Sequence, residues 1–359
     1  MQGQSNKLDF KGENIYVGFD VHLKNWQVTI MTENLTHKTF SHPPDPKLLY
    51  EYLARNFPGG TYYSAYEAGF CGYWIHNQLK SLGINSIVVN PADIPTTDKE
   101  KVQKEDSRDS RKIARTLRSG DLVAIYVPCL KTLEDRSLVR TRAALVKDAT
   151  RNKNRVKSFL HFHGIAIPEV FKEGRWSNRF VYWLDSIELI EPSGKVSLQA
   201  IVSATKNLRV SLLDITRKIR TLSQTGPYIE NVKLLRSIPG IGLITAMTLL
   251  TELESMERFE NFDSLCAYVG LIPSTHSSGE NDVIGDITRR GHGVLRTALI
   301  ESAWMAARLD PALAKSYNSY CKRMEPNKAV TRIAKKLLSR IRFVLKNKKS
   351  YVCSVVTKD

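Results

Sequence analysis

The sequence contains little cysteine, and its five cysteines are far apart: Cys71, Cys129, Cys266, Cys321 and Cys353. None belongs to a C-x-x-C pair or has a histidine nearby at zinc-ligand spacing, which argues against a structural zinc site and a disulfide framework. Long uncharged runs are also absent, since Ser237–Thr251 is too short to cross a bilayer. The N-terminus lacks the apolar segment of a signal peptide. These absences predict a reduced, cytoplasmic protein with no membrane partner.

Acidic residues are scarce after residue 100. Residues 1–100 carry 8 basic and 10 acidic side chains, whereas residues 101–359 carry 45 basic and 26 acidic ones. The net charge of +17 therefore belongs to the later part of the chain. Such an excess indicates a polyanionic partner, nucleic acid more often than membrane. A length of 359 residues is typical of two domains, with room for a connecting element.

The first part of the chain alternates strand-like and helix-like patterns. Three strand-like runs, NIYVGFDVH, WQVTIMT and KTF, are followed by helix, strand, helix, strand and helix. The order β-β-β-α-β-α-β-α is that of a ribonuclease H-like (RuvC-like) mixed sheet flanked by helices. We predict an α/β domain over residues 13–128, an all-α coiled-coil region over 129–225 and a mostly helical C-terminal domain over 226–359.

The middle region carries an apolar seam with alternating spacings of three and four, broken only by Thr205. Its members are Leu198, Ile201, Leu208, Leu212, Ile215, Ile219 and Leu222. An earlier helix, at about 130–163, has its own apolar stripe, and Arg136 and Arg140 are assigned to its other faces. The seam is compatible with a hairpin inside one chain and with dimerisation. Between the helices, aromatics interleave with arginine over 175–183, which fits either a small satellite core or stacking on unpaired bases.

Four carboxylates have positions that suit a metal site. Asp20 and Glu67 each end a predicted strand, and Asp106 and Asp109 lie three apart on one helix face. Phosphoryl transfer on nucleic acid uses divalent cations held by hard oxygen ligands on rigid supports. Taken singly, each carboxylate is equally compatible with a turn or a solvated helix face. Together, in this order, they predict an Mg²⁺ site, with Mn²⁺ as an alternative ion.

Two further features predict contact with nucleic acid. The segment IPGIG lies between apolar helical runs, as in a helix-hairpin-helix, and its Gly240 and Gly242 would let backbone N–H groups approach a phosphate. A plain turn between packed helices is the alternative.

Residues 315–349 hold 12 basic residues and one acid. The apolar residues of this segment form one helical stripe, so the cations lie on the outer faces of the helix. We expect five of these cations to contact phosphates: Lys335, Lys336, Arg340, Arg342 and Lys346.

Ser278 precedes a glycine, in a turn that would expose its hydroxyl, although Ser-Ser-Gly is also common in ordinary loops. Nearby arginines would hold a phosphate and stabilise developing charge: Arg289, Arg290 and Arg296.

These residues resemble the bridge-RNA-guided insertion-sequence transposases, which pair an N-terminal RuvC-like DEDD domain with a C-terminal serine-bearing domain and are related to pilin-gene inverting recombinases. The similarity runs from about Ile15 to the basic tail. The family's carboxylates fall on Asp20 in GFDVH, Glu67 in YEAG and the pair in KEDSRDSRKIA. Its serine falls on Ser278, with Ser277 adjacent. This chain has Gly-Phe after Glu-Ala, where the family often has Thr-Gly.

The resemblance implies an RNA-guided, site-specific DNA recombinase in which the four carboxylates bind Mg²⁺ and Ser278 forms a covalent link to DNA. It also implies donor and target DNA, a structured guide RNA, a homo-oligomer that assembles from dimers into a synaptic tetramer, and a bacterial or archaeal, nucleoid-associated location. Two other functions remain compatible with the residues. One is a RuvC-like junction resolvase or nuclease that uses water as nucleophile, and the other is a non-catalytic nucleic-acid-binding protein.

Overall fold

The structure is a computed structural model that describes residues 9–94, 106–171, 176–278, 281–288 and 290–353. The chain divides into two compact units, Met1–Val127 and Pro128–Asp359. No helix in the described ranges is long and apolar enough to cross a membrane.

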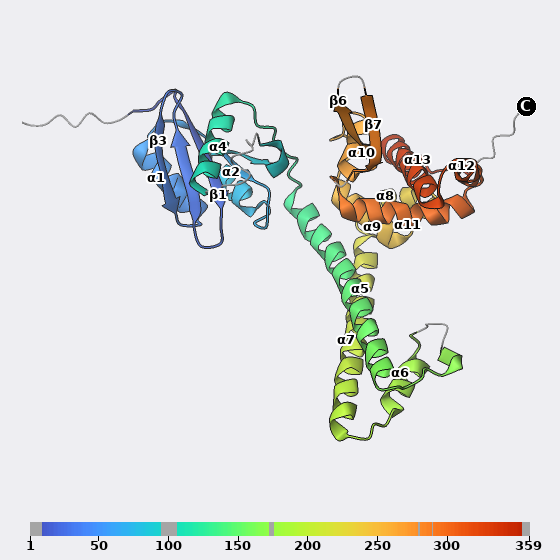
Figure 1. The fold of residues 1–359 in the computed structure, drawn as a ribbon. Helices are drawn as coiled ribbons and strands as arrows, with labels where there is room; N and C mark the ends of the chain where they lie inside the picture. Colours follow the sequence, from blue (N-terminus) through green and yellow to red (C-terminus); the bar gives the residue numbers. More distant parts are fainter. Residues whose placement is uncertain (1–8, 95–105, 172–175, 279–280, 289, 354–359) are drawn as a thin grey trace, which may run out of the picture. The chain divides into compact units, whose positions relative to one another are not determined.

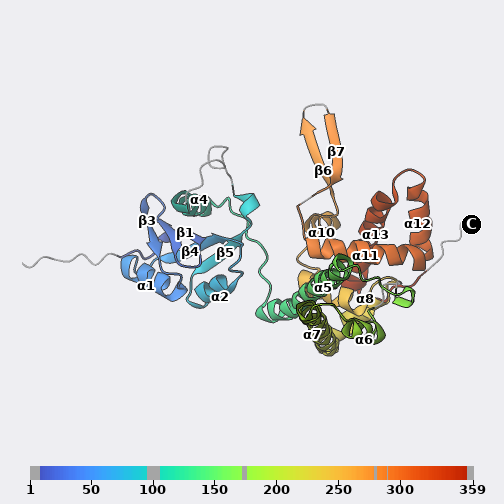
Figure 2. The ribbon, with the colours of Figure 1, turned by 60° about the horizontal axis from the view of Figure 1, so that its bottom comes forward.

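The first unit is a mixed five-stranded sheet between helices. The strand order is β3-β2-β1-β4-β5, with β2 antiparallel to both of its neighbours and β1, β4 and β5 parallel. Figure 2 shows α4 on one face of the sheet and α1 and α2 on the other. The predicted order of strands and helices is confirmed. The elements are β1 (Asn14–Val21), β2 (Trp26–Met31), β3 (Thr36–His42), α1 (Pro46–Asn56), β4 (Thr61–Glu67), α2 (Trp74–Ser81), β5 (Asn85–Val89), a 3-10 turn η1 (Pro91–Asp93) and α4 (Asp106–Ser119).

Alternation along β1 divides its side chains between the two faces. Ile15, Val17 and Phe19 are fully buried in the core beneath α1 and α2. Phe19 stacks on both Trp26 and Tyr66, at ring-centroid distances of 5.2 Å. The intervening positions of β1 face α4, on the side of the sheet to which the strand-end carboxylates belong.

The second unit begins with two long helices, α5 (Leu130–Phe162) and α7 (Pro192–Leu222). Figure 1 shows them side by side, joined at one end by the segment that contains α6 (Asn178–Ser186) and the 3-10 turn η2 (Glu169–Phe171). Near that end, Val156 of α5 packs with Leu198 and Val202 of α7. The seam therefore pairs within one chain, as the hairpin alternative predicted.

Thr205, which interrupts the apolar seam, has a polar partner across the helix pair. The amide Nδ2 of Asn152 donates to the Thr205 hydroxyl at 2.7 Å and to the Ile201 carbonyl at 2.9 Å. Asn152 and Thr205 are only 4% and 7% exposed. A buried amide must be satisfied, so this pair favours one register of α5 on α7.

The rest of the second unit is a helical body with one hairpin. Its core includes the C-terminal stripe predicted from the sequence, since Ala334, Leu337, Leu338, Ile341 and Leu345 are all buried. The elements are α8 (Ile229–Arg236), α9 (Leu243–Leu253), α10 (Phe262–Val269), β6 (Pro273–Ser278), β7 (Asn281–Ile287), α11 (Gly293–Leu309), α12 (Pro311–Cys321) and α13 (Pro326–Asn347).

We predict that Thr205→Val lowers the free energy of unfolding by about 1–3 kcal/mol, because it leaves the buried Asn152 amide with one partner fewer. The double variant Asn152→Leu/Thr205→Val should recover most of this loss, since both polar groups are then removed. Urea unfolding followed by circular dichroism measures both. Thr141→Val, on an exposed face of α5, is the control. Equal stabilities of the single variant and the control would contradict a role for this pair.

Candidate carboxylate site and nucleic-acid interface

Asp20 and Glu67 lie side by side at the ends of two neighbouring parallel strands. The register pairs Phe19 of β1 with Tyr66 of β4, so the next residue on each strand is a carboxylate. In a parallel pair, residues at one level point to the same face. Ala65, two residues before Glu67, packs in the small core beneath α4, which places both carboxylates on the α4 face.

Gly18 allows α4 to lie directly on this face of the sheet. A Cβ at Gly18 would lie 2.2 Å from the backbone nitrogen of Ala114 and 2.5 Å from the carbonyl oxygen of Ser110. The Ser110 hydroxyl is also 2.9 Å from the Thr29 hydroxyl of β2, and Thr29 is paired with Gly18. Any side chain at position 18 would therefore move the helix away from the sheet.

The direction of α4 brings its N-terminal end toward the same edge of the sheet. Near the C-terminal end of α4, Arg118 Nη1 donates to the Thr32 carbonyl. Thr32 follows β2 directly, and this end of β2 pairs with the start of β1. The predicted pair Asp106 and Asp109 is thus on the turn of α4 closest to Asp20 and Glu67. The side chain of Asp106 lies outside the described part of the structure.

Two of the carboxylates lie close to side-chain nitrogen atoms. Asp20 Oδ2 is 3.2 Å from His22 Nε2, and Asp109 Oδ1 is 3.5 Å from Lys112 Nζ. Asp20 and Asp109 are about four-fifths buried, with 20% and 21% of their side chains exposed. No group of three or more metal-ligating side chains occurs among those described, which leave out Asp106. The oxygen-only donor set at this sheet edge nevertheless suits a hard divalent cation.

Ser277 and Ser278 end the strand β6, beside the tip of the β6–β7 hairpin. Ser278 is paired with Asn281 and Ser277 with Asp282, as judged from the backbone. Figure 2 shows this hairpin standing out from the helical body that contains α10, α11 and α13. The side chains of both serines, and the whole of Arg289, are outside the described structure. Arg290 is exposed at the hairpin base.

The base of the hairpin is built around Arg296 and two glycines. Arg296 Nη1 donates to the Thr288 carbonyl at 2.6 Å and to the Gly270 carbonyl at 3.4 Å. A Cβ at Gly291, whose φ is +126°, would lie 2.5 Å from the Cα of Gly270. Arg296 thus braces the hairpin, a role that sequence analysis did not assign to it.

A buried carboxylate, Glu252, joins this base to α5. Glu252 is 1% exposed and receives a bidentate pair of hydrogen bonds from Arg140, at 2.7 and 2.8 Å. Arg136 Nε lies 3.3 Å and His292 Nε2 3.2 Å from the same carboxylate. The prediction that Arg136 occupies an outer face of the helix is wrong, because it is 8% exposed and bonded to α9. The sequence signal that could have indicated a buried partner for Arg136 is one acid, Glu252, at the end of an apolar helical run.

The IPGIG segment is a turn between α8 and α9, as predicted. Gly240 has a φ of +89°, and a Cβ there would lie 2.5 Å from the Ser302 carbonyl oxygen. The turn therefore packs tightly against α11 at Gly240, whereas nothing lies within 4 Å of a Cβ at Gly242. Of the two glycines, Gly242 has the open approach that a phosphate requires.

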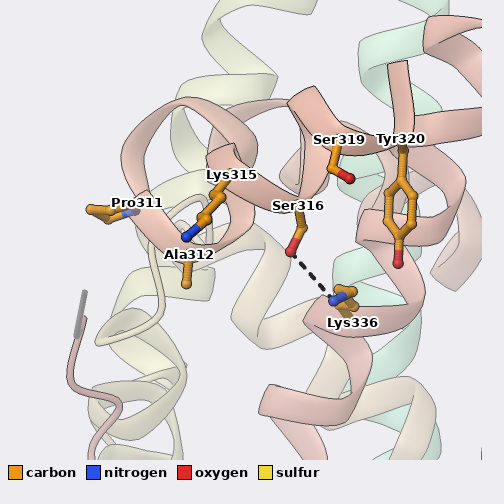
Figure 3. Close-up of a pocket in the computed structure, with 7 residues that line it drawn as sticks. All are labelled: Pro311, Ala312, Lys315, Ser316, Ser319, Tyr320 and Lys336. Atoms are coloured by element: carbon orange, nitrogen blue, oxygen red, sulfur yellow. Dashed lines mark hydrogen bonds between the residues drawn. The ribbon is translucent and has the colours of Figure 1, made fainter. Parts of the chain in front are cut away.

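The predicted C-terminal cations have different surroundings. Lys336 lies in a pocket between α12 and α13, where Nζ is 3.3 Å from the Ser316 hydroxyl and 5.8 Å from the Tyr320 ring centroid. Figure 3 shows Ser316 of α12 joined to this lysine, with Lys315, Ser319 and Tyr320 also on α12 among the residues that line the pocket. Lys335 is 3.7 Å from Asp263.

Arg340 belongs to a structural network instead of an open surface. Its Nε donates to the Tyr351 hydroxyl at 2.9 Å, and that hydroxyl donates to the fully buried Asp310 at 2.6 Å. Arg340 thereby fastens the segment that follows α13 to the N-cap of α12.

Comparisons with known proteins match two separate stretches of the chain, the first of which extends from the sheet unit through α5. Residues 17–165 match a family model for the DEDD domain of IS110 transposases, described as "Transposase". Residues 232–318 match a second model, described as "Transposase IS116/IS110/IS902 family". Both matches are to transposase domains, and together they cover more than half of the chain. The chain belongs to the IS110/IS116 family of insertion-sequence transposases.

Curated relatives carry the same description. A putative transposase, y4qE, from Sinorhizobium fredii is 32% identical over 253 residues, which cover 70% of this chain and 60% of the relative. The transposase for insertion sequence element IS1533 from Leptospira borgpetersenii is 29% identical over 66% of this chain and 68% of the relative. A second S. fredii protein, putative transposase y4rJ, is 26% identical over 90% of both chains. The chain thus spans less than two thirds of the first of these relatives.

Glu252 predicts a specific loss of stability in acid. Burial raises the pKa of Glu252, but hydrogen bonds from His292 and Arg140 outweigh it and lower the pKa from 4.5 to about 2. A carboxylate whose pKa is lowered by folding stabilises the fold at pH values above its pKa in the unfolded chain. This stabilisation, about 3 kcal/mol, is lost as the pH falls from 4.5 toward 2. The urea midpoint of the wild type should therefore fall more steeply in this range than that of Glu252→Gln. Asp148→Asn, at an exposed pair with Arg151, should follow the wild type.

Proposed function

We propose that this protein is an RNA-guided, site-specific DNA transposase, which cuts and rejoins DNA for the movement of an insertion sequence. The observation that carries the proposal is the adjacency of Asp20 and Glu67 on the α4 face of the sheet, with Asp109 at the near end of α4. Membership of the IS110/IS116 family supports DNA as the substrate.

The proposed fold of the first unit is ribonuclease H-like. The order β3-β2-β1-β4-β5, with only β2 antiparallel to its neighbours, supports this assignment. Asp20, Glu67, Asp106 and Asp109 would hold Mg²⁺ or Mn²⁺. When bound, the metal would stabilise negative charge that develops on a phosphate. Lys112, beside Asp109, would reduce the mutual repulsion of these carboxylates before metal binds.

Ser278 is the proposed nucleophile. Its Oγ would form a bond to the scissile phosphorus while the bond from phosphorus to a deoxyribose oxygen breaks, and the serine proton would end on that departing oxygen. The phosphodiester energy is kept in the phosphoserine, so the reverse attack by a deoxyribose hydroxyl can rejoin the strand. The position of Ser278 at the end of the β6–β7 hairpin, away from the helical core, supports access to DNA. Arg290 and Arg289 would contact the phosphate nearby.

The proposed partners are donor DNA, target DNA, a structured guide RNA and further copies of this chain that form a synaptic tetramer from dimers. The excess of basic residues after residue 100 supports nucleic-acid partners. Lys335, Lys336 and the open side of the Gly242 turn are the proposed contacts to phosphate, and Lys336 lies in a pocket whose lining has no carboxylate among the described residues. A cytoplasmic, nucleoid-associated location follows from these partners.

Removal of one proposed ligand should stop recombination. Asp20→Asn and Glu67→Gln should each lower the recombination rate about a hundredfold or more, because loss of second-shell support alone costs about 10–100-fold at metal sites. Glu51→Gln, on the exposed surface of α1, should retain the wild-type rate. The assay counts recombinant plasmid junctions in cells, with protein level and circular dichroism as controls for folding. Wild-type rates in both ligand variants would disprove the carboxylate site.

Quenching the reaction in denaturant should trap DNA joined to protein through a phosphoserine. Ser278→Ala should lose both the adduct and recombination, whereas Ser277→Ala should keep at least part of each, and peptide mapping of the adduct identifies the attached residue. Attachment at Ser277 would move the assignment by one residue. Cleaved DNA without any adduct would contradict the serine mechanism and favour a RuvC-like nuclease that uses water. Metal-independent binding without cleavage would favour a non-catalytic protein.

A further inference from the structure

The second unit has a groove along α5, α6 and α7 that the proposed chemistry does not use. It is separate from the β6–β7 hairpin and from the α12–α13 pocket. We name it the arm groove. Its basic lining residues are Arg142, Lys153, Lys206, Arg209, Arg217 and Arg220, and its apolar and aromatic ones include Val146, Trp176, Val181, Tyr182, Val210 and Leu213.

The charge of the arm groove has one sign. None of the described residues that line it is acidic, whereas six are basic. Of these six, Lys206 reaches Asp185 at 2.6 Å, beyond the lining. The acids of the same helices form pairs elsewhere, since Asp148 binds Arg151 and Asp214 binds Lys218. Concentrated positive charge in a groove attracts a polyanion.

The groove also exposes apolar and aromatic surface that water does not favour. Tyr182 is 73% exposed, Val210 67% and Leu213 53%. The other aromatics of the connecting segment form a satellite core, in which Phe180 is buried and packs against Trp176 and Trp183. That outcome agrees with the satellite-core alternative, except that Tyr182 stays outside this core and Trp176, at its edge, also lines the groove.

Trp176 is held at the edge of the groove by cations. Lys153 Nζ lies 5.5 Å from its ring centroid, and Arg209 Nη1 donates to its backbone carbonyl at 3.4 Å. Aromatic rings flanked by lysine and arginine are the combination that binds unpaired bases, because the ring stacks on the base while the cation contacts the phosphate.

The same charges disfavour a second copy of this chain as the occupant. A symmetric dimer through the arm groove would bring its six basic residues and the same six of the partner into one interface. Like charges brought together in a partly desolvated interface cost free energy that scattered contacts to Val210 and Leu213 do not offset. An occupant with negative charge and flat apolar faces satisfies both parts of the groove.

We propose that the arm groove binds a single-stranded segment of RNA, with bases stacked on Tyr182 and Trp176 and phosphates held by Arg209, Arg217 and Arg220. RNA is favoured over DNA because structured RNA presents unpaired bases in its loops, whereas donor and target DNA are duplexes until the guide RNA pairs with them. The inference rests on the proposed function only in taking RNA as a partner, and it requires neither the carboxylates nor Ser278.

The test measures binding of fluorescein-labelled U₁₅ RNA to the full-length protein in EDTA, so that no catalysis occurs. Arg209→Gln/Arg217→Gln should weaken binding about tenfold and reduce the slope of log affinity against log salt by about 1.4, because each phosphate that is no longer neutralised lowers that slope by about 0.7. Arg151→Gln/Lys218→Gln removes the same charge from other faces of the same helices and should change affinity less than about twofold, since exposed pairs contribute little.

Tyr182→Ala should weaken U₁₅ binding at least about fivefold without changing the salt slope, because the variant cannot stack on a base but keeps the charges. Tyr182→Phe should bind as the wild type does. Blunt duplex RNA, which offers no unpaired bases, should not distinguish Tyr182→Ala from the wild type. Circular dichroism checks the folding of every variant.

Two results would overturn the inference. One is equal U₁₅ affinity of the groove double variant and its matched control, which would make the charge effect nonspecific. The other is a groove variant that keeps U₁₅ affinity but loses self-association in sedimentation velocity, which would assign the groove to a second copy. Loss of U₁₅ binding in groove variants supports the inference even if Asp20→Asn recombines normally. Failure of the carboxylate site and failure of the groove are therefore distinguishable.

Discussion

The close approach of α4 to the sheet at Gly18 is the constraint on which the proposed carboxylate site depends. The backbone of Ser110 and Ala114 fills the volume that a side chain at position 18 would need. This contact sets the height of the helix above the sheet, and therefore the distance between Asp109 and the strand-end carboxylates. A metal site tolerates errors of only a few tenths of an ångström, so a backbone contact that leaves no free volume supports it well.

The second unit uses buried polar groups for the same purpose. Glu252 accepts hydrogen bonds from the long helix α5 and from His292 at the N-cap of α11, so one carboxylate fixes two elements in addition to their apolar packing against the core. Asn152 and Thr205 align α5 and α7. Buried polar pairs cost free energy when misaligned, which is why they specify geometry where apolar packing alone would allow several registers.

Arginine has three roles in this chain, which a charge count does not separate. Arg136 and Arg140 neutralise a buried acid, Arg296 and Arg340 brace a hairpin and a terminus, and Arg209 lines a groove whose described lining residues include no acid. A guanidinium with five donors can satisfy several carbonyls or carboxylates at once, so it is used in the interior as well as toward phosphate. Only the last of these groups lies in the proposed RNA-binding groove.

The sequence by itself determined the order of elements in the first unit, the hairpin-compatible seam of the second and the apolar stripe of α13, because these follow from periodicity and turn residues along the chain. It also placed Asp20 and Glu67 at strand ends. Only the tertiary structure decided that these two are neighbours, since strand register depends on contacts 47 residues apart in the chain. The same holds for Arg136, which sequence placed outside and the structure buries, because the acid that neutralises it comes from a distant helix.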